Sequence, residues 1–156
     1  MNKGVSFEHF AVSCLNSRVR GLAVSHCGGR LDGGVDFAGS WLLEVPVPVV
    51  GQCKRHVRRI GPGPVRELQA VAASSFALLV SASGFSREAL SWADAPATSA
   101  PMLLMALDPL SGRVGRLALN RAAKEMHPRL AVASELGDEG RSPVLLFDGS
   151  VVLRGT

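Results

Sequence analysis

The chain has 156 residues and a mass of 16.4 kDa, which is enough for one domain with a single core. Hydrophobic residues make up 47% and charged residues 19%, which excludes a disordered tail and a coiled coil. Aromatic residues, at 5%, are too few for a base-stacking surface. The 17 Lys and Arg against 13 Asp and Glu give a net charge of +4, which favours a polyanionic partner.

The cysteines do not predict a disulfide framework or a zinc site, and the longest uncharged stretch does not predict a membrane helix. Cys14, Cys27 and Cys53 are widely spaced and form no C-x-x-C pair, so we expect thiols without a disulfide framework or a zinc site. Residues 68–86 carry no charge, but they include a glutamine, a glycine and five serines, which are too polar for a lipid-facing helix. We therefore expect a soluble protein with no membrane part.

The first third of the chain predicts a helix followed by three strands. In residues 5–18 apolar side chains recur with helical spacing, with Ser6 as the N-cap and Glu8 in the first turn. A short strand over 21–25 leads into a glycine-rich loop. Two β-rich runs, 35–43 and 47–54, are separated by Glu44-Val-Pro46 and predict an antiparallel pair.

The rest of the chain predicts alternating helices and strands. Gly61-Pro-Gly-Pro64 starts a helix with Pro64 at or near N1, and its buried side is Val65, Leu68, Ala72 and Phe76. The later elements are an interior strand over 77–81, a helix capped by Ser86 and ending near 93, an interior strand over 102–107, a strand then a helix within 114–126, and a hairpin over 144–153 about Asp148-Gly149. This order predicts an α/β single domain, a mixed sheet between helices.

Three polar residues suggest a chemical site. The loop Asp32-Gly-Gly-Val-Asp36 delivers Asp36 to the start of a strand, and Gln52 and Lys54 end the next strand. Because side chains alternate along a strand, Gln52 and Lys54 share one face and Cys53 points to the other. Each feature has an ordinary explanation, since Asp-Gly-Gly is a common turn and Gln-x-Lys is usually a solvated face. Together and in this order they are much less probable by chance.

These residue types suit metal-assisted hydrolysis of a phosphodiester. Mg²⁺ prefers oxygen ligands and keeps several waters, so Asp36, the Gln52 amide oxygen and the Cys53 backbone carbonyl would suffice. The metal would acidify a bound water and stabilise charge on the phosphoryl oxygens. Lys54 would orient that water or neutralise the developing charge.

A basic run follows Lys54 and contains no acidic residue before Glu67. Its arginines are Arg55, Arg58, Arg59 and Arg66. Such a run is often only a solvated surface. Beside the acid, amide and lysine it favours contact with nucleic-acid phosphates.

The order of these motifs resembles the Mrr-like branch of the PD-(D/E)XK nucleases. The resemblance covers residues 1–110 and implies a restriction-endonuclease-like mixed central sheet flanked by helices, with residues 111–156 as a C-terminal extension of helix and hairpin packed on that core. It is carried by Phe7-Glu8, Gly29-x-x-Asp32-Gly-Gly-Val-Asp36, Val50-Gly-Gln52-Cys-Lys54-Arg55, Val65-Arg-Glu-Leu68 and Val80-Ser-Ala-Ser-Gly-Phe-Ser-Arg-Glu-Ala89.

The resemblance also implies a role for each matching residue. Asp36 is the metal-binding aspartate, Lys54 the motif lysine, and Glu8 the first-helix glutamate that supports the site in many members. Gln52 stands at the usual acidic position, which removes a negative charge and predicts weaker metal affinity. Ser83 matches one of a Ser/Thr pair that would contact phosphate or cap the strand end.

Two functions follow from this reading. The first is a Mg²⁺-dependent endonuclease that acts on DNA through Asp36, Gln52 and Lys54. The alternative is a catalytically silent nuclease fold that binds RNA within a large ribonucleoprotein such as a mitochondrial ribosome. The last third is similar to fungal mitochondrial members required for respiratory growth, which favours mitochondria over the bacterial cytoplasm. Asp32 is expected to form a turn and not to bind metal.

Overall fold

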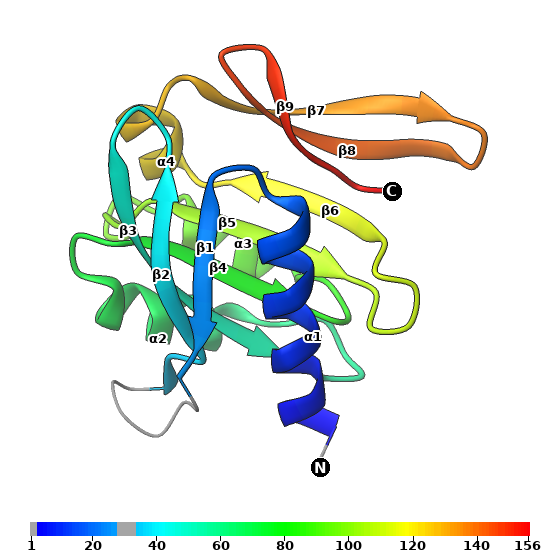
Figure 1. The fold of residues 1–156 in the computed structure, drawn as a ribbon. Helices are drawn as coiled ribbons and strands as arrows, with labels where there is room; N and C mark the ends of the chain where they lie inside the picture. Colours follow the sequence, from blue (N-terminus) through cyan, green and yellow to red (C-terminus); the bar gives the residue numbers. More distant parts are fainter. Residues whose placement is uncertain (1–2, 28–33) are drawn as a thin grey trace.

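The structure is a computed structural model that describes residues 3–27 and 34–156, and it shows an α/β domain (Figure 1). Asp32 lies outside the described residues. In chain order the elements are α1 (Lys3–Arg18), β1 (Leu22–His26), β2 (Phe37–Leu42), β3 (Pro46–Lys54), α2 (Pro62–Ala72), β4 (Phe76–Ser81), α3 (Arg87–Ala93), β5 (Met102–Leu107), β6 (Val114–Leu119), α4 (Arg121–Met126), β7 (Leu130–Gly137), β8 (Gly140–Phe147) and β9 (Ser150–Arg154).

Helices cover both faces of a mixed central sheet, as the sequence predicted. The six-stranded sheet has the order β1-β2-β3-β4-β5-β6, with β3, β4 and β5 parallel and the outer pairs antiparallel. The apolar side of α1 packs on one face through Phe7, Ala11 and Leu15. α2 and α3 cover the other face (Figure 1), with Leu68 and Ala89 in a second cluster.

The interior strands form where the sequence predicted them. Every residue of β4 is buried, as expected for a strand covered on both faces. The antiparallel pair of β2 and β3 is confirmed by a register that sets Phe37 opposite Gly51. Ser86 is confirmed as the N-cap of α3, because its hydroxyl accepts a hydrogen bond from the Ala89 N–H.

The helix starts were predicted less well. α1 begins at Lys3, so Ser6 is not its N-cap and Glu8 lies beyond its first turn. α2 begins within Gly61-Pro-Gly-Pro64 as predicted, but Pro62 and not Pro64 is its first residue; a proline suits this position because the first helical turn leaves its N–H groups unused. Phe76 belongs to β4 and not to α2, since the chain turns at Ala73 with a φ of 52°.

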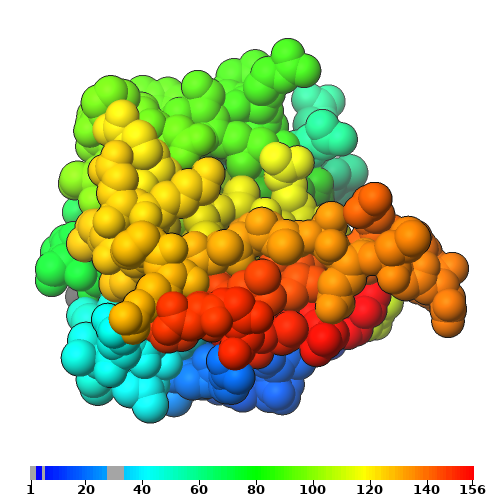
Figure 2. Space-filling model, turned by 90° about the horizontal axis from the view of Figure 1, so that it is seen from above, coloured from blue at the N-terminus to red at the C-terminus, as the bar shows by residue number. Residues whose placement is uncertain are grey.

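The C-terminal residues form a second, three-stranded sheet in the order β7-β8-β9, and β7 was not predicted. The hairpin at Asp148-Gly149 is confirmed, with positive φ at both residues. The strands lie across one side of the molecule in the space-filling view (Figure 2), and Leu130, Leu145 and Leu153 join the core that contains α1.

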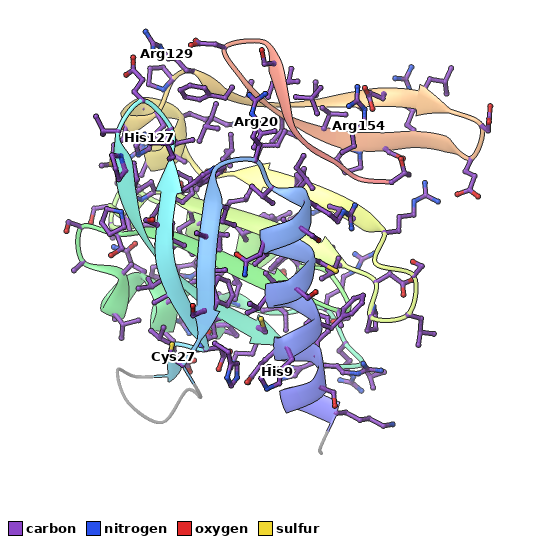
Figure 3. The ribbon with its side chains drawn as sticks, in the orientation of Figure 1. His9, Arg20, Cys27, His127, Arg129 and Arg154 are labelled. Carbon is purple, nitrogen blue, oxygen red and sulfur yellow. The ribbon has the colours of Figure 1, made fainter. Side chains whose placement is uncertain are left out.

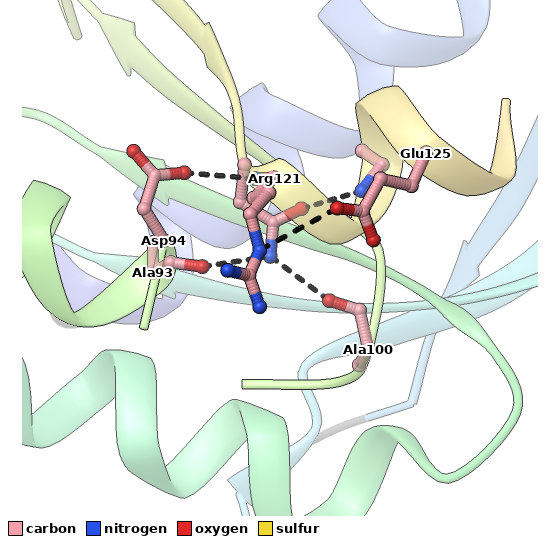
Figure 4. A network of polar contacts seen from close by, with 7 residues as sticks. Ala93, Asp94, Ala100, Arg121 and Glu125 are labelled. Atoms are coloured by element: carbon pink, nitrogen blue, oxygen red, sulfur yellow. Dashed lines mark hydrogen bonds and ion pairs between the residues drawn. The ribbon is translucent and has the colours of Figure 1, made fainter. Parts of the chain in front are cut away.

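A buried asparagine connects the elements around β5. The Asn120 amide donates to the carbonyls of Ala93 and Ala100 at 2.9 and 3.0 Å, and its side-chain oxygen accepts from the Met102 N–H. Asp94 and Arg121 extend the same network (Figure 4). Because each of these polar groups is satisfied within the fold, we assign the network a structural role.

The uncharged stretch 68–86 divides between the end of α2 and β4, as predicted. None of the helices in the described part of the chain is long and apolar enough to cross a membrane.

Candidate active site

Several polar side chains meet at one edge of the central sheet. β1 ends at His26, β2 begins just after Asp36 and β3 ends at Lys54, and antiparallel pairing brings these three positions to the same edge. The first half of α1 lies beside that edge. Figure 3 shows His9 and Cys27 together at this end of the molecule, away from Arg129 and Arg154.

Asp36 is held rigidly by the backbone of β3. Its side chain is buried, with 8% of the residue exposed, and Oδ2 accepts a hydrogen bond of 2.7 Å from the Cys53 N–H. The Asp36 N–H donates to the Gly51 carbonyl at 2.8 Å. The residue that the sequence proposed as the metal-binding acid therefore has a fixed position beside the end of β3.

The environment of Asp36 disfavours its charge. The pKa of this carboxyl is raised overall from its usual 3.8 to about 6, chiefly by burial and in addition by the charge and a hydrogen bond of the nearby Glu8 carboxyl. The Cys53 N–H and the Lys54 ammonium act in the opposite direction. At neutral pH the group is ionised at a cost that a bound cation would offset.

Gln52 has a buried side-chain amide near the end of β3. The residue is 3% exposed, and its Nε2 donates to the Gly34 carbonyl at 3.1 Å, which fixes the orientation of the amide. Its Oε1 is buried and has no hydrogen-bond partner among the described residues. Leaving such an acceptor unpaired costs about 1–3 kcal/mol.

An acid and an unpaired amide oxygen fit the preference of Mg²⁺ for oxygen ligands. In residues 3–27 and 34–156, no three side chains of His, Cys, Asp and Glu form a group that could by itself hold a metal ion. A cation here would therefore need the Gln52 oxygen, backbone carbonyls and water in addition to Asp36. This donor set suits Mg²⁺ better than a transition metal that prefers imidazole or thiolate.

Lys54 and Cys53 differ in exposure and in chemistry. Lys54 is partly exposed, and its backbone carbonyl accepts from the Ala82 N–H at 3.0 Å, which ties it to β4. Cys53 packs into the core on the α1 side. Burial, with the nearby Asp36 and Glu8 charges, raises the pKa of the Cys53 thiol well above its usual value. The thiol is therefore neutral and is not a nucleophile.

Glu8 reaches the site from α1 and has a second partner that the sequence did not suggest. His26 Nε2 lies 2.7 Å from Glu8 Oε2, and both side chains are largely buried, at 21% and 18% exposed. The His9 ring stacks on His26 with ring centroids 4.3 Å apart. No spacing pattern in the sequence could reveal this contact, because it joins a helix to a strand.

The basic loop after β3 is exposed and is attached to the end of β4. Arg55, Arg58 and Arg59 are all exposed. The Ser83 hydroxyl donates to the Arg58 carbonyl at 2.6 Å, so it holds the loop. Arg66 lies on α2, where its guanidinium stacks over the Trp92 ring at 5.1 Å.

A mixed central sheet flanked by helices is the architecture of a restriction-endonuclease-like domain. Residues 2–112 match the family Mrr_cat, described as restriction endonuclease, and the chain belongs to that family.

Two further proteins are similar to the chain. An uncharacterized mitochondrial protein of Schizosaccharomyces pombe, C824.03c, is 37% identical over 71 residues, which is 43% of this chain and 28% of that protein. The structure of the MspJI restriction endonuclease in complex with a 27-mer oligonucleotide is 24% identical with a TM-score of 0.47, over 66% of this chain and 26% of that one. The chain thus spans about a quarter of the length of each.

Proposed function

We propose that the chain is a Mg²⁺-dependent endonuclease that hydrolyses phosphodiester bonds in DNA. The observations that carry the proposal are the buried Asp36 carboxylate before β2 and, near the end of the adjacent strand β3, the buried Gln52 Oε1, which has no partner among the described residues; Lys54 ends β3. Both oxygens are costly to keep without a cation. Domains of this family type typically use divalent metals, which agrees with this donor set.

Asp36, the Gln52 amide oxygen and the Cys53 carbonyl would hold the ion, with water completing its coordination. When bound, Mg²⁺ acidifies a coordinated water and stabilises charge on the phosphoryl oxygens. Asp36 supplies the negative charge from a position fixed by the Cys53 N–H. The Lys54 ammonium orients the attacking water or neutralises charge that develops on the phosphate.

Glu8 compensates for the missing acid at position 52. A glutamine contributes a dipole but no charge, so the pair of Asp36 and Gln52 carries one negative charge. Glu8 lies close enough to raise the pKa of Asp36, and it therefore adds a second charge to the field at the site. We propose this as its supporting role.

The exposed arginines 55, 58 and 59 would contact the phosphates on either side of the cleaved bond. Exposed arginines bind phosphate oxygens without reading sequence, so this contact positions the nucleic acid. Arg66 is proposed to extend the same phosphate-binding surface, and Ser83 to support it by holding the loop through the Arg58 carbonyl.

A nicking assay tests the enzyme. The purified chain incubated with supercoiled plasmid and Mg²⁺ should produce nicked circles, and Asp36→Ala and Lys54→Ala should abolish the product. Asp138→Ala and Lys124→Ala are matched controls, because both residues are exposed and lie outside the site. Equal nicking by Asp36→Ala and the unaltered chain would refute the proposal.

The second candidate is an RNA-binding component of a ribonucleoprotein, and the exposed arginines favour it. Two results would support this candidate in a chain that does not nick DNA. RNA binding should survive Asp36→Ala, and it should fail when Arg55, Arg58 and Arg59 are changed to glutamate. Binding by three arginines should also weaken with salt, with a slope of about −2 to −3 in log K against log salt.

We also propose a mitochondrial location and a division of the chain into a nuclease core, 1–110, and an extension, 111–156. The location is supported by the mitochondrial relative, and import into isolated mitochondria would test it. The division is supported by the family match over residues 2–112, and limited proteolysis of the whole chain, which should cleave near residue 110, would test it.

A further inference from the structure

The contact between Glu8 and His26 has no role in the chemistry described so far. His26 is the last residue of β1, and its register partner Phe37 directly follows Asp36. The Cys27 N–H donates to the Asp36 carbonyl at 2.8 Å, so the end of β1 is fixed to the segment that carries Asp36. His26 is thus attached to the site through the backbone and to α1 through Glu8.

The contact restricts Glu8 in a way that its own helix does not. A glutamate has three rotatable side-chain bonds, so a place on a helix does not by itself fix where the carboxylate lies. His26 Nε2 at 2.7 Å from Oε2 selects the rotamer in which the carboxylate faces the end of β1 and Asp36. The stacked His9 ring in turn holds the His26 ring.

We propose that His26 is a positioning residue for the metal site, which holds the Glu8 carboxylate beside Asp36 so that its charge contributes to binding a divalent cation. The inference rests on the proposed metal site and deepens it. His26 acts on the cation through Glu8 and not by contact. Partners that orient the groups around a metal typically change metal affinity about 10-fold to 100-fold when they are removed.

Binding of Mg²⁺ to the whole chain without DNA, measured by isothermal titration calorimetry, tests this role. His26→Ala should raise the dissociation constant about tenfold. His26→Gln should restore most of the affinity, because its amide keeps an N–H donor that can reach Glu8. His56→Ala removes an exposed histidine from the basic loop and should bind Mg²⁺ like the unaltered chain.

A double-mutant cycle separates positioning from a merely structural effect. If His26 acts through Glu8, then His26→Ala should change the affinity by less than about twofold in a chain that already carries Glu8→Gln. Circular dichroism should show that each variant is folded. If His26→Ala is not, His26→Asn takes its place, since its amide is too short to reach Glu8.

The possible results lead to different conclusions. Equal Mg²⁺ affinity in His26→Ala and the unaltered chain would overturn the positioning role. The same conclusion would follow if His26→Ala lowered the Mg²⁺ affinity just as much in the Glu8→Gln chain, or if His26→Gln did not restore binding. If the unaltered chain binds no Mg²⁺, the proposed metal site itself is wrong, and the role of His26 is rejected with it.

Discussion

Replacing Asp36 by asparagine should make the metal-free protein more stable at about pH 8 while removing its response to Mg²⁺. Because the pKa of Asp36 is raised from 3.8 to about 6 in the folded protein, keeping this carboxylate ionised lowers the free energy of unfolding. At 1.36 kcal/mol for each pKa unit, the cost is about 3 kcal/mol. Asparagine carries no charge and keeps an oxygen that can accept from the Cys53 N–H, so we expect a gain of up to about 3 kcal/mol.

The sign of the pH dependence follows from the same values. Because the pKa of Asp36 is higher in the folded than in the unfolded chain, the folded state binds more protons between pH 3.8 and about 6. The contribution of the Asp36 carboxyl to the stability of the fold is complete below pH 3.8 and is lost as the pH rises through about 6. The advantage of Asp36→Asn should therefore grow from about pH 4 to pH 7 and then stay constant.

Urea and thermal unfolding in the presence of a chelator would measure this difference. For a chain of this length, 1 kcal/mol corresponds to about 2–4 °C in Tm. Added Mg²⁺ should then raise the Tm of the unaltered chain, since a ligand of the folded state stabilises it, and leave Asp36→Asn unchanged. Asp138→Asn at an exposed turn is the control. A variant less stable than the unaltered chain at about pH 8, or a difference that does not vary with pH, would refute the reasoning.

Two further substitutions test the site and the sheet beneath it. Gln52→Glu adds a second negative charge to the proposed metal site, so it should tighten Mg²⁺ binding about tenfold in calorimetry. It should also lower the Tm of the metal-free chain, because two nearby carboxylates repel each other. An unchanged Mg²⁺ affinity would contradict this expectation. Gly51→Ala places a Cβ atom 1.9 Å from Cζ of the fully buried Phe37, so it should destabilise the fold by about 1–3 kcal/mol in urea unfolding. Gly115→Ala, where a Cβ atom meets open space, is its control, and equal stability of the two variants would disprove the crowding.

The fold could be predicted where local sequence and tertiary environment agree. The continuous apolar run of Phe76–Ser81 is buried on both faces, and Ser86 precedes a helix that it caps. β7 was missed because apolar residues run from Leu130 to Ala133 without alternating with polar ones, so the period of two that marks a half-buried strand is absent. Its position is set by pairing with β8, which is a long-range interaction with no local signal.

The start of α1 was missed for a related reason. The periodic apolar side chains begin at Phe7, but the helix extends back to Lys3 through residues whose described side chains are exposed. A helical turn of this kind is stabilised by continuation of the backbone hydrogen bonds and not by burial. Periodicity therefore located the buried part of the helix and placed its beginning too late.

Part of the candidate site could be proposed from residue types and their spacing alone. Strand alternation and a turn motif were enough to propose Asp36, Gln52 and Lys54, and these residues lie at neighbouring strand ends. The contact of His26 with Glu8 depends on how α1 crosses the end of β1, which no local pattern specifies.

Two features at one edge of the central sheet lower the stability of the fold, and folding alone does not explain why they are present. The Asp36 carboxyl is buried with a raised pKa, and the Gln52 Oε1 is buried without a partner in the described part of the chain. Either feature costs stability in the free protein, and a leucine or a paired amide would avoid the cost. A single divalent cation would satisfy both oxygens at once, so the proposed metal site accounts for two costs that would otherwise need separate explanations.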